Sequence, residues 1–255
     1  MADALRAIGQ VAPDFLAALR VHLIETSPRL RAIQAENLPG RVAGWHDRLE
    51  TLPDAPLLLL ANEFLDALPI RQFVRRGEFW TERFVGPAGF AEHPAGLLGR
   101  QAADGEIIEI REPADAIAAH LAARFARRPG IALFLDYGPA ESAPGDSLQA
   151  LRDGQPADPL TEAGSADLTA HVDFAAFARA AAGAAVHGPL AQGKFLARLG
   201  LFQRTDRLAR GQSPVRALAL IESARRLAEP DRMGRLFKAL AVCHVDCPVL
   251  PGFEP

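Results

Sequence analysis

Cysteine, lysine and long apolar runs are all scarce in this sequence of 255 residues. Its two cysteines, Cys243 and Cys247, cannot form a disulfide framework for a chain of this size, so we expect a reducing compartment. The richest apolar run, residues 56–61, is far shorter than the roughly 20 residues that cross a bilayer. The sequence therefore excludes a membrane-spanning helix.

An excess of charge of one sign is also lacking. The formal net charge is −3 and the pI is near 6.2, which gives no electrostatic footprint of a nucleic-acid partner. Residues 1–6 have neither the basic and apolar regions of a signal peptide nor the arginine-rich character of a transit peptide. Only two of the 28 basic residues are lysine, a composition typical of GC-rich bacterial genomes. We expect a cytoplasmic bacterial protein.

The sequence does show an alternation of helix and strand patterns. In its first part the apolar spacing predicts a helix in two pieces over 2–20 with a break at Pro13, a strand over 21–24, a helix over 27–37 and a short strand over 41–44. The apolar runs 57–61 and 131–135 do not alternate with polar residues, which is typical of strands buried on both faces of a parallel sheet. This pattern predicts an α/β fold, in which ligands gather at the carboxyl ends of the strands.

Two segments depart from that alternation. Residues 71–112 alternate polar and apolar side chains between turn signals at Gly77 and Gly105, and they predict an antiparallel β insertion. Residues 138–170 are rich in glycine, proline, aspartate and serine, and they predict a long functional loop. The remaining sequence predicts helices over 173–183, 193–199 and 213–228 and strands over 184–188 and 236–245.

Several motifs, in order over almost the whole chain, resemble those of the MidA family. They are residues 21–31, Trp45-His46, residues 61–69, Asp136-Tyr137-Gly138, residues 145–150, residues 167–174, Gln192-Gly193 and Met233-Gly234. This family comprises class I S-adenosylmethionine-dependent methyltransferases, and its mitochondrial members methylate an arginine on a core subunit of respiratory complex I. The resemblance implies a Rossmann-like sheet with S-adenosylmethionine as the cofactor.

The chain departs from the family pattern before Met1. Family members carry there a first strand and a glycine-rich loop that holds the methionine part of the cofactor, and we expect both to be missing from this chain. We therefore expect residues 1–255 to form a single partial methyltransferase domain that includes the 71–112 insertion and the 138–170 loop.

The resemblance and the strand-end rule together predict cofactor-binding residues. Glu25 ends the second strand of the fold, where a carboxylate can accept both ribose hydroxyls of an adenosyl cofactor, although it could instead be a solvent-exposed acid beside a helix start. Trp45 and His46 follow the third strand, where an aromatic or imidazole face could pack on adenine, while a lone tryptophan is as readily a core residue. Asn62 closes the next apolar run, where class I enzymes meet the methionine part of the cofactor.

Methylation of arginine requires carboxylates, because the guanidinium is protonated near neutral pH and must be aimed at the methyl group. We expect Glu63 and Asp66 to bind the guanidinium in a bidentate manner. Asp136 and the His171/Asp173 pair are further candidates. His171 could accept a proton near its ordinary pKa or, alternatively, order its loop.

No metal site is expected. Residues 243–247 group two thiols and an imidazole, but one such cluster cannot supply the four ligands of a closed zinc site. The resemblance thus implies an S-adenosylmethionine-dependent methyltransferase with a protein substrate, such as an arginine of a respiratory complex I subunit. The alternatives are a non-catalytic assembly or binding factor and an inactive fragment that lacks the glycine-rich loop.

The expected loss of the first strand generates a prediction. That strand would lie between the strands at 21–25 and 57–61, and its loss would expose two apolar edges. We therefore expect a marginally stable chain that self-associates, as a homodimer or a larger species. Light scattering combined with thermal unfolding tests this, and cooperative melting of a monodisperse monomer would contradict it.

Overall fold

The computed structural model describes every residue from 1 to 255, and its contacts separate residues 1–55 from residues 56–255. In the first unit the elements are helix α1 (Ala2–Val11), helix α2 (Pro13–Ala18), strand β1 (Val21–Ile24), helix α3 (Pro28–Asn37), strand β2 (Val42–His46) and a 3-10 turn (Leu49–Thr51). The structure confirms the predictions of a first helix in two pieces, a strand after it and a second helix. β2 continues past the predicted strand to His46.

Local chemistry determines where α3 begins. Ser27 Oγ accepts a hydrogen bond from the backbone N–H of Leu30 at 3.3 Å, and Pro28 occupies the first turn, where no backbone N–H is needed. β1 and β2 pair in parallel with Ile24 opposite His46. Glu25 and His46 therefore lie at the same carboxyl edge of this two-stranded sheet.

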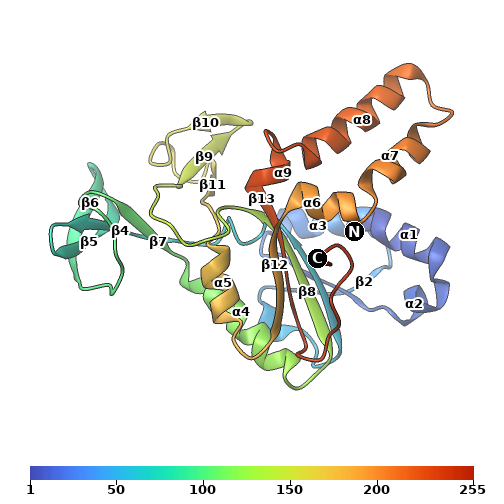
Figure 1. Cartoon of the computed structure of the whole chain (residues 1–255), viewed down its shortest axis with the longest axis horizontal. Helices are drawn as coiled ribbons and strands as arrows, with labels where there is room; N and C mark the ends of the chain where they lie inside the picture. Colours follow the sequence, from blue (N-terminus) through green and yellow to red (C-terminus); the bar gives the residue numbers. More distant parts are fainter. The chain divides into compact units, whose positions relative to one another are not determined.

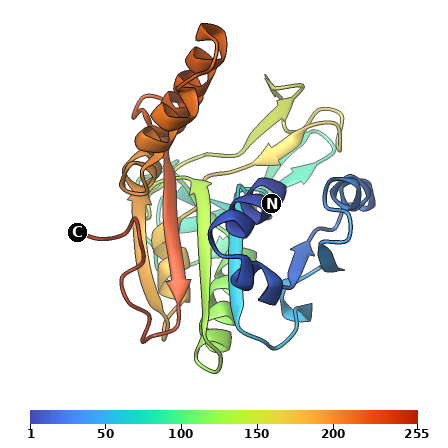
Figure 2. The same ribbon diagram turned by 90° about the vertical axis from the view of Figure 1, so that its right-hand side faces the viewer.

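Residues 56–255 are built around a four-stranded sheet (Figure 2). Its strands, in spatial order, are β12 (Ala185–Ala191), β13 (Phe237–Cys243), β8 (Gly130–Tyr137) and β3 (Leu57–Asn62). β3 and β8 are parallel, whereas β13 is antiparallel to both of its neighbours. The carboxyl ends of β3 and β8 therefore meet at one edge of the sheet.

The core of this second unit lies where helices α4 (Glu112–Phe125) and α5 (Phe174–Ala180) pack against the sheet. Phe134 of β8 is 1% exposed and meets Phe177 of α5 edge-on, with ring centres 4.8 Å apart. The last five residues of β13, 239–243, are fully buried. Aromatic and aliphatic packing on one face of the sheet therefore fixes the strands whose carboxyl ends form that edge.

The outer strand β3 corrects one sequence prediction. The apolar run 57–61 predicts burial on both faces, yet Leu58 and Leu60 are 57% and 65% exposed. β3 is the last strand of its sheet, and its side chains alternate between a partly buried face and an open one. A run of leucines contains no signal of this asymmetry, because both faces carry the same chemistry.

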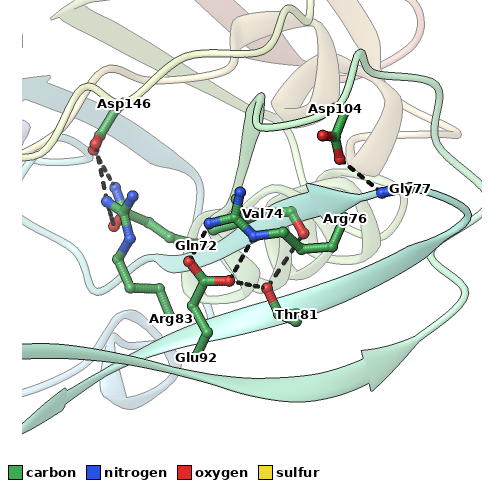
Figure 3. Close-up of polar contacts among 9 residues, drawn as sticks. All are labelled: Gln72, Val74, Arg76, Gly77, Thr81, Arg83, Glu92, Asp104 and Asp146. Carbon is green, nitrogen blue, oxygen red and sulfur yellow. Dashed lines mark hydrogen bonds and ion pairs between the residues drawn. The ribbon is translucent and has the colours of Figure 1, made fainter.

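Residues 71–110 form four antiparallel strands. These are β4 (Arg71–Arg76), β5 (Phe79–Gly86), β6 (Gly89–Gly96) and β7 (Ile107–Ile110), in the spatial order β6-β5-β4-β7. They extend away from the main sheet (Figure 1), and Glu92 accepts hydrogen bonds from Arg76 Nε at 2.9 Å and Thr81 Oγ1 at 2.6 Å (Figure 3). The sequence pattern does not predict β6, an edge strand whose position tolerates Pro94.

The segment predicted as a long loop, residues 138–170, contains a small antiparallel sheet. Its strands are β9 (Gln149–Arg152), β10 (Gln155–Ala157) and β11 (Asp167–Thr169), in the order β10-β9-β11. Asp153 and Gly154 both have positive φ and form the turn between β9 and β10, so this Asp-Gly pair is the hairpin signal that composition alone conceals. Arg83 of β5 pairs with Asp146 at 2.9 Å and ties the segment to the insertion (Figure 3).

Helices complete the second unit. They are α6 (Gln192–Arg198), α7 (Leu201–Ala209), α8 (Pro214–Ala228) and α9 (Met233–Leu236). α5, α6 and α8 confirm predicted helices, whereas the sequence pattern predicts neither α4 nor α7. α7 and α8 pack side by side as a hairpin (Figure 1). None of the helices combines the length and the apolar character that crossing a membrane requires.

The aromatic core contact generates a prediction about stability. We expect Phe134→Ala to lower the free energy of unfolding by about 3–5 kcal/mol, because it removes a fully buried ring and leaves a cavity. Phe79→Ala is the matched control, since that ring on β5 is 65% exposed and its loss should cost within about 0.5 kcal/mol. Urea unfolding measures both. Similar losses in the two variants would show that the core lies elsewhere.

Candidate cofactor and acceptor sites

Glu25, just after β1, is held in a short chain of side-chain hydrogen bonds. Its Oε1 accepts from the backbone N–H of Ser27 at 2.9 Å, and its Oε2 accepts from the side-chain amide nitrogen Nε2 of Gln34 at 3.2 Å. Gln34 Oε1 in turn accepts from the indole Nε1 of Trp45 at 2.9 Å. A carboxylate has about four acceptor positions, so Glu25 is oriented while keeping capacity for two further donors.

Both ring nitrogens of His46 are engaged. One lies 2.9 Å from Nδ1 of His22, and the other lies 3.0 Å from Thr51 Oγ1. Burial and the neighbouring His46 lower the pKa of His22. These contacts occupy both ring nitrogens, so the packing on adenine that the sequence analysis expects would use the face of the ring.

In the second unit, Asn62 and Glu63 are exposed at the carboxyl end of β3. The backbone N–H of Glu63 still donates to Leu135 at 2.9 Å, after which the chain leaves the sheet with a positive φ of 48° at Glu63. Asn62 Nδ2 donates to Glu63 Oε1 at 3.2 Å. A left-handed conformation at a non-glycine residue is uncommon, and it occurs here at an exposed residue just after the strand.

Asp136, at the end of β8, anchors the segment that follows β3. Its Oδ2 accepts from the backbone N–H groups of residues 64, 65 and 66 at 2.8–3.3 Å, and its Oδ1 accepts from that of Tyr137 at 2.9 Å. The side chain is 1% exposed, and burial together with the charge of Asp66 raises the pKa of Asp136 to about 6. Asp136 is therefore a loop anchor, which accounts for a residue that the sequence suggested as a catalytic candidate.

Arg111, at the start of α4, holds the same segment from the other direction. Its guanidinium donates to the carbonyl oxygens of Leu65, Asp66 and Leu68 and to those of Ala170 and His171, at 2.5–3.3 Å. Arg111 is only 7% exposed. The sequence analysis missed this residue, because its partners are backbone carbonyls far away in the chain.

Asp66 is the buried carboxylate of the site. It is 5% exposed, and its Oδ1 has no hydrogen-bond partner. Burial raises the pKa of Asp66, a hydrogen bond from Tyr137 lowers it, and the charge of Glu63 raises it further, which places Glu63 within electrostatic range. A buried acceptor atom without a partner is costly unless a ligand satisfies it.

His171 contributes to a cavity that Glu63 and Asp66 do not line. Its backbone N–H donates to Ser147 Oγ at 2.8 Å, and that hydroxyl donates to Glu109 Oε2. The ring lies edge-on to Tyr137 at 5.6 Å and lines a cavity of about 660 Å³ that contains neither Glu63 nor Asp66. Burial lowers the pKa of His171, so it does not keep the ordinary value that the sequence analysis assumed.

Comparisons with known proteins identify the family. Residues 1–190 match a protein family described as "Putative S-adenosyl-L-methionine-dependent methyltransferase". The chain belongs to this methyltransferase family. The family is described as dependent on S-adenosylmethionine.

Solved and curated relatives agree with that assignment. A Burkholderia thailandensis protein described as a "likely methyl transferase", crystallised with S-adenosyl-homocysteine, is 28% identical over 99% of this chain and 70% of its own, with a TM-score of 0.82. The mitochondrial protein arginine methyltransferase NDUFAF7 of Danio rerio is 31% identical over 88% of this chain, and its Drosophila melanogaster homolog is 30% identical over 99%. The chain spans 61% of the length of the former and 68% of the latter.

The residues of this chain fit an adenosyl cofactor in one respect that the structure itself provides. Glu25 is half-buried, fixed by Ser27 and Gln34, and has unused acceptor positions, which suits the two hydroxyls of a ribose. Trp45 is held by Gln34 beside it. Gln34 therefore orients both residues, a role that its position nine residues after Glu25 on α3 does not reveal in the sequence.

Two other residues that the sequence analysis names, Asp173 and Cys243, are accounted for by their local structure. Asp173 caps α5 by accepting from the N–H of Ala176 at 2.8 Å, and it accepts from Ser142 Oγ at 2.9 Å. Cys243 is fully buried, and burial raises the pKa of its thiol to about 12. No group of three or more His, Cys, Asp or Glu side chains is placed to hold a metal ion.

The raised pKa of Asp136 generates a prediction about pH. A carboxyl with a pKa of about 6 when folded and about 4 when unfolded binds its proton more tightly in the folded chain, so its contribution to stability grows as the pH falls from 7 to 5. Asn at this position does not titrate. We therefore expect Asp136→Asn to lower the free energy of unfolding by about 1 kcal/mol more at pH 5 than at pH 7.

Urea unfolding of both proteins at the two pH values measures this difference. Asp104→Asn serves as the control, because that exposed carboxylate only accepts from the N–H of Gly77. A cost for Asp136→Asn that is equal at both pH values, or larger at pH 7, contradicts the assignment.

Proposed function

We propose that the protein transfers a methyl group from S-adenosylmethionine to an arginine side chain of a protein acceptor, such as a subunit of respiratory complex I, in a bacterial cytoplasm. The observation that carries this proposal is the carboxylate of Asp66, buried beside Glu63 with one oxygen left without a partner. A guanidinium would satisfy that oxygen with a charge-assisted hydrogen bond.

The geometry suggests how the carboxylates would act. Glu63, exposed at the tip of β3, would bind one edge of the guanidinium, while Asp66 Oδ1 would bind a second N–H from inside the site. Fixing the planar guanidinium in this way limits its orientation, and orientation of the reacting groups is a large source of rate acceleration in group transfer. The cofactor, when bound, supplies an electrophilic methyl group on sulfur.

One proton must leave the acceptor nitrogen during the transfer. The new N–CH₃ bond forms as the bond from sulfur to methyl breaks, and the nitrogen gives up a proton so that the product guanidinium keeps a single positive charge. Asp66 Oδ1 is the acceptor that we assign to this proton, because burial raises the pKa of Asp66 and makes it a stronger base than an exposed carboxylate.

The relatives support the class of acceptor. The NDUFAF7 proteins of zebrafish and fly are named as protein arginine methyltransferases of mitochondria. Because the chain matches only 61% of the zebrafish protein's length, the acceptor residue and the partner protein remain part of the proposal. His171, expected as a catalytic residue from the sequence, is not part of this mechanism, since it lines the separate cavity.

The test separates cofactor binding from methyl transfer. Titration calorimetry with S-adenosylhomocysteine measures cofactor affinity, and a radiolabelled methyl group measures transfer to the proteins of a bacterial extract. Both assays are run on Glu63→Gln, Asp66→Asn and the control Glu78→Gln, which changes an exposed carboxylate on the insertion. We expect Glu63→Gln and Asp66→Asn each to lower transfer about 100-fold or more while cofactor affinity changes less than twofold. Glu78→Gln should match the wild type in both assays.

Other outcomes count against the proposal. Methyl transfer that survives in both carboxylate variants overturns the role of Glu63 and Asp66 in binding the guanidinium. Methylated products that carry the label on a residue other than arginine overturn the acceptor class. A chain that binds S-adenosylhomocysteine but labels no protein favours a non-catalytic binding factor.

A further inference from the structure

Helices α7 and α8 form a hairpin that extends away from the main sheet of residues 56–255 (Figure 1 and Figure 2). α7 contains no buried residue, and Ala224 is the only buried residue of α8. The hairpin therefore contributes little to the core of its unit. We call residues 204–218 the hairpin tip, which comprises the end of α7, the connecting turn and the start of α8.

Apolar side chains are exposed at the hairpin tip. Val215 and Leu218 of α8 are 79% and 59% exposed, and Leu208 of α7 is 44% exposed. Val215 and Leu218 lie three residues apart, so they are neighbours on the surface of α8. Single exposed apolar residues are ordinary on protein surfaces, but three around one projecting turn indicate a contact with an apolar partner.

The hairpin tip also carries an excess of positive charge. It contains four arginines and one acidic residue, a net charge of +3, although the whole chain has a net charge of −3. Asp206, the one acid, accepts a hydrogen bond from Arg210 Nη2 at 2.6 Å. Arg204, Arg207 and Arg216 are exposed, and their side chains form no hydrogen bond or ion pair. Three arginines are therefore available to an anionic partner.

The helices around the hairpin tip do not neutralise these arginines. Helices α6 and α9, which pack against the hairpin, contain no aspartate or glutamate. Toward the base of α8, Glu222 and Glu229 each pair with Arg225 and Arg232 at 3.2–3.6 Å. Asp231 follows α8 and lies about 20 Å along the helix axis from its first turn, at a rise of about 1.5 Å per residue. That distance exceeds the Debye length of about 8 Å at physiological salt, so the tip keeps its positive field.

An anionic lipid bilayer matches this combination of charge and apolar exposure. Its phosphates attract arginine side chains, and the boundary of its hydrocarbon layer accepts apolar side chains at the same surface. A nucleic acid would bind the arginines but would leave Val215 and Leu218 in water. Two tips that met in a dimer would place their positive charges against each other. A projecting turn also suits a bilayer, because a bilayer needs no groove of matching shape.

We propose that the hairpin tip docks on the surface of a bilayer that contains anionic phospholipid. Leu208, Val215 and Leu218 enter the boundary between headgroups and acyl chains, while the three unpaired arginines contact headgroup phosphates. The contact is confined to the surface, since no helix is long and apolar enough to cross a membrane. Docking goes beyond the proposed function and does not require methyl transfer.

Flotation of the full chain with lipid vesicles tests the proposal without any cofactor. One set of vesicles contains only phosphatidylcholine, and the other contains about 30% phosphatidylglycerol, an anionic phospholipid. We expect the chain to bind the anionic vesicles about tenfold or more tightly at low salt, and this difference to shrink as the salt concentration rises. Thermal unfolding confirms that each variant described below is folded.

Two triple variants, each with three exposed arginines replaced by glutamine, test the charge. The tip variant is Arg204→Gln/Arg207→Gln/Arg216→Gln, and the control variant is Arg29→Gln/Arg41→Gln/Arg127→Gln. Both variants lose the same charge from the surface. Because each basic residue near an anionic bilayer contributes about fivefold to affinity, the tip variant should bind about 100-fold more weakly. The control variant should lose less than about threefold.

Two double variants test the apolar side chains. Val215→Gln/Leu218→Gln changes the hairpin tip, and Val85→Gln/Leu97→Gln changes the same residue types on the insertion, where they are 70% and 80% exposed. We expect the tip pair to weaken binding to anionic vesicles about tenfold or more, because two apolar side chains then stay in water. The control pair should keep affinity within about twofold of the wild type.

Other results overturn bilayer docking. Equal losses in the tip and control arginine variants show that the tip is not the contact, and unchanged binding of Val215→Gln/Leu218→Gln shows that nothing apolar enters the bilayer. Binding to polyglutamate or DNA without binding to anionic vesicles assigns the tip to an acidic macromolecule. A dimer in sedimentation equilibrium that Val215→Gln/Leu218→Gln abolishes assigns the tip to a second copy of the chain. Failure of methyl transfer leaves all these readouts unchanged, so the two proposals can fail separately.

Discussion

The second unit depends on the burial of the Arg111 guanidinium. Removing a charged group from water costs several kcal/mol, and here backbone carbonyls of two separate segments offset that cost. Residues 65–68 after β3 and residues 170–171 before α5 are joined through this one side chain. The guanidinium adds to a direct backbone link between the two segments, in which the N–H of Ala170 donates to the carbonyl oxygen of Asp66 at 3.1 Å.

Asp136 complements Arg111 on the segment after β3. The carboxylate takes the N–H groups of residues 64–66, while the guanidinium takes carbonyl oxygens of residues 65, 66 and 68. Two buried charges of opposite sign thus satisfy a backbone that belongs to no helix or strand. The side chains of Glu63 and Asp66 are thereby freed for ligands, and their backbone is already ordered, which lowers the entropy that ligand binding would cost.

Much of the local structure was predictable because its causes are local. Pro13 breaks the first helix, Ser27-Pro28 starts α3, and the apolar run after residue 56 forms β3, each through neighbours in the chain. The strand-end rule also located Glu25 and Trp45 correctly at one edge of the first sheet, where Gln34 joins them. The pattern missed β6, an edge strand that is exposed along most of its length, and the helices α4 and α7.

The sequence alone determined the family resemblance, the α/β character and the acidic residues at the strand ends, since these follow from motifs and periodicity. Only the tertiary structure separated the roles of those residues. Asp66 is a buried carboxylate, and one of its oxygens has no hydrogen-bond partner. Asp136 anchors the backbone after β3, and His171 lines a cavity that Asp66 does not line. The reason is physical: burial and hydrogen-bond partners decide what a carboxylate or an imidazole can do. The partners of Arg111 lie 43 to 60 residues away, where no sequence pattern reports them.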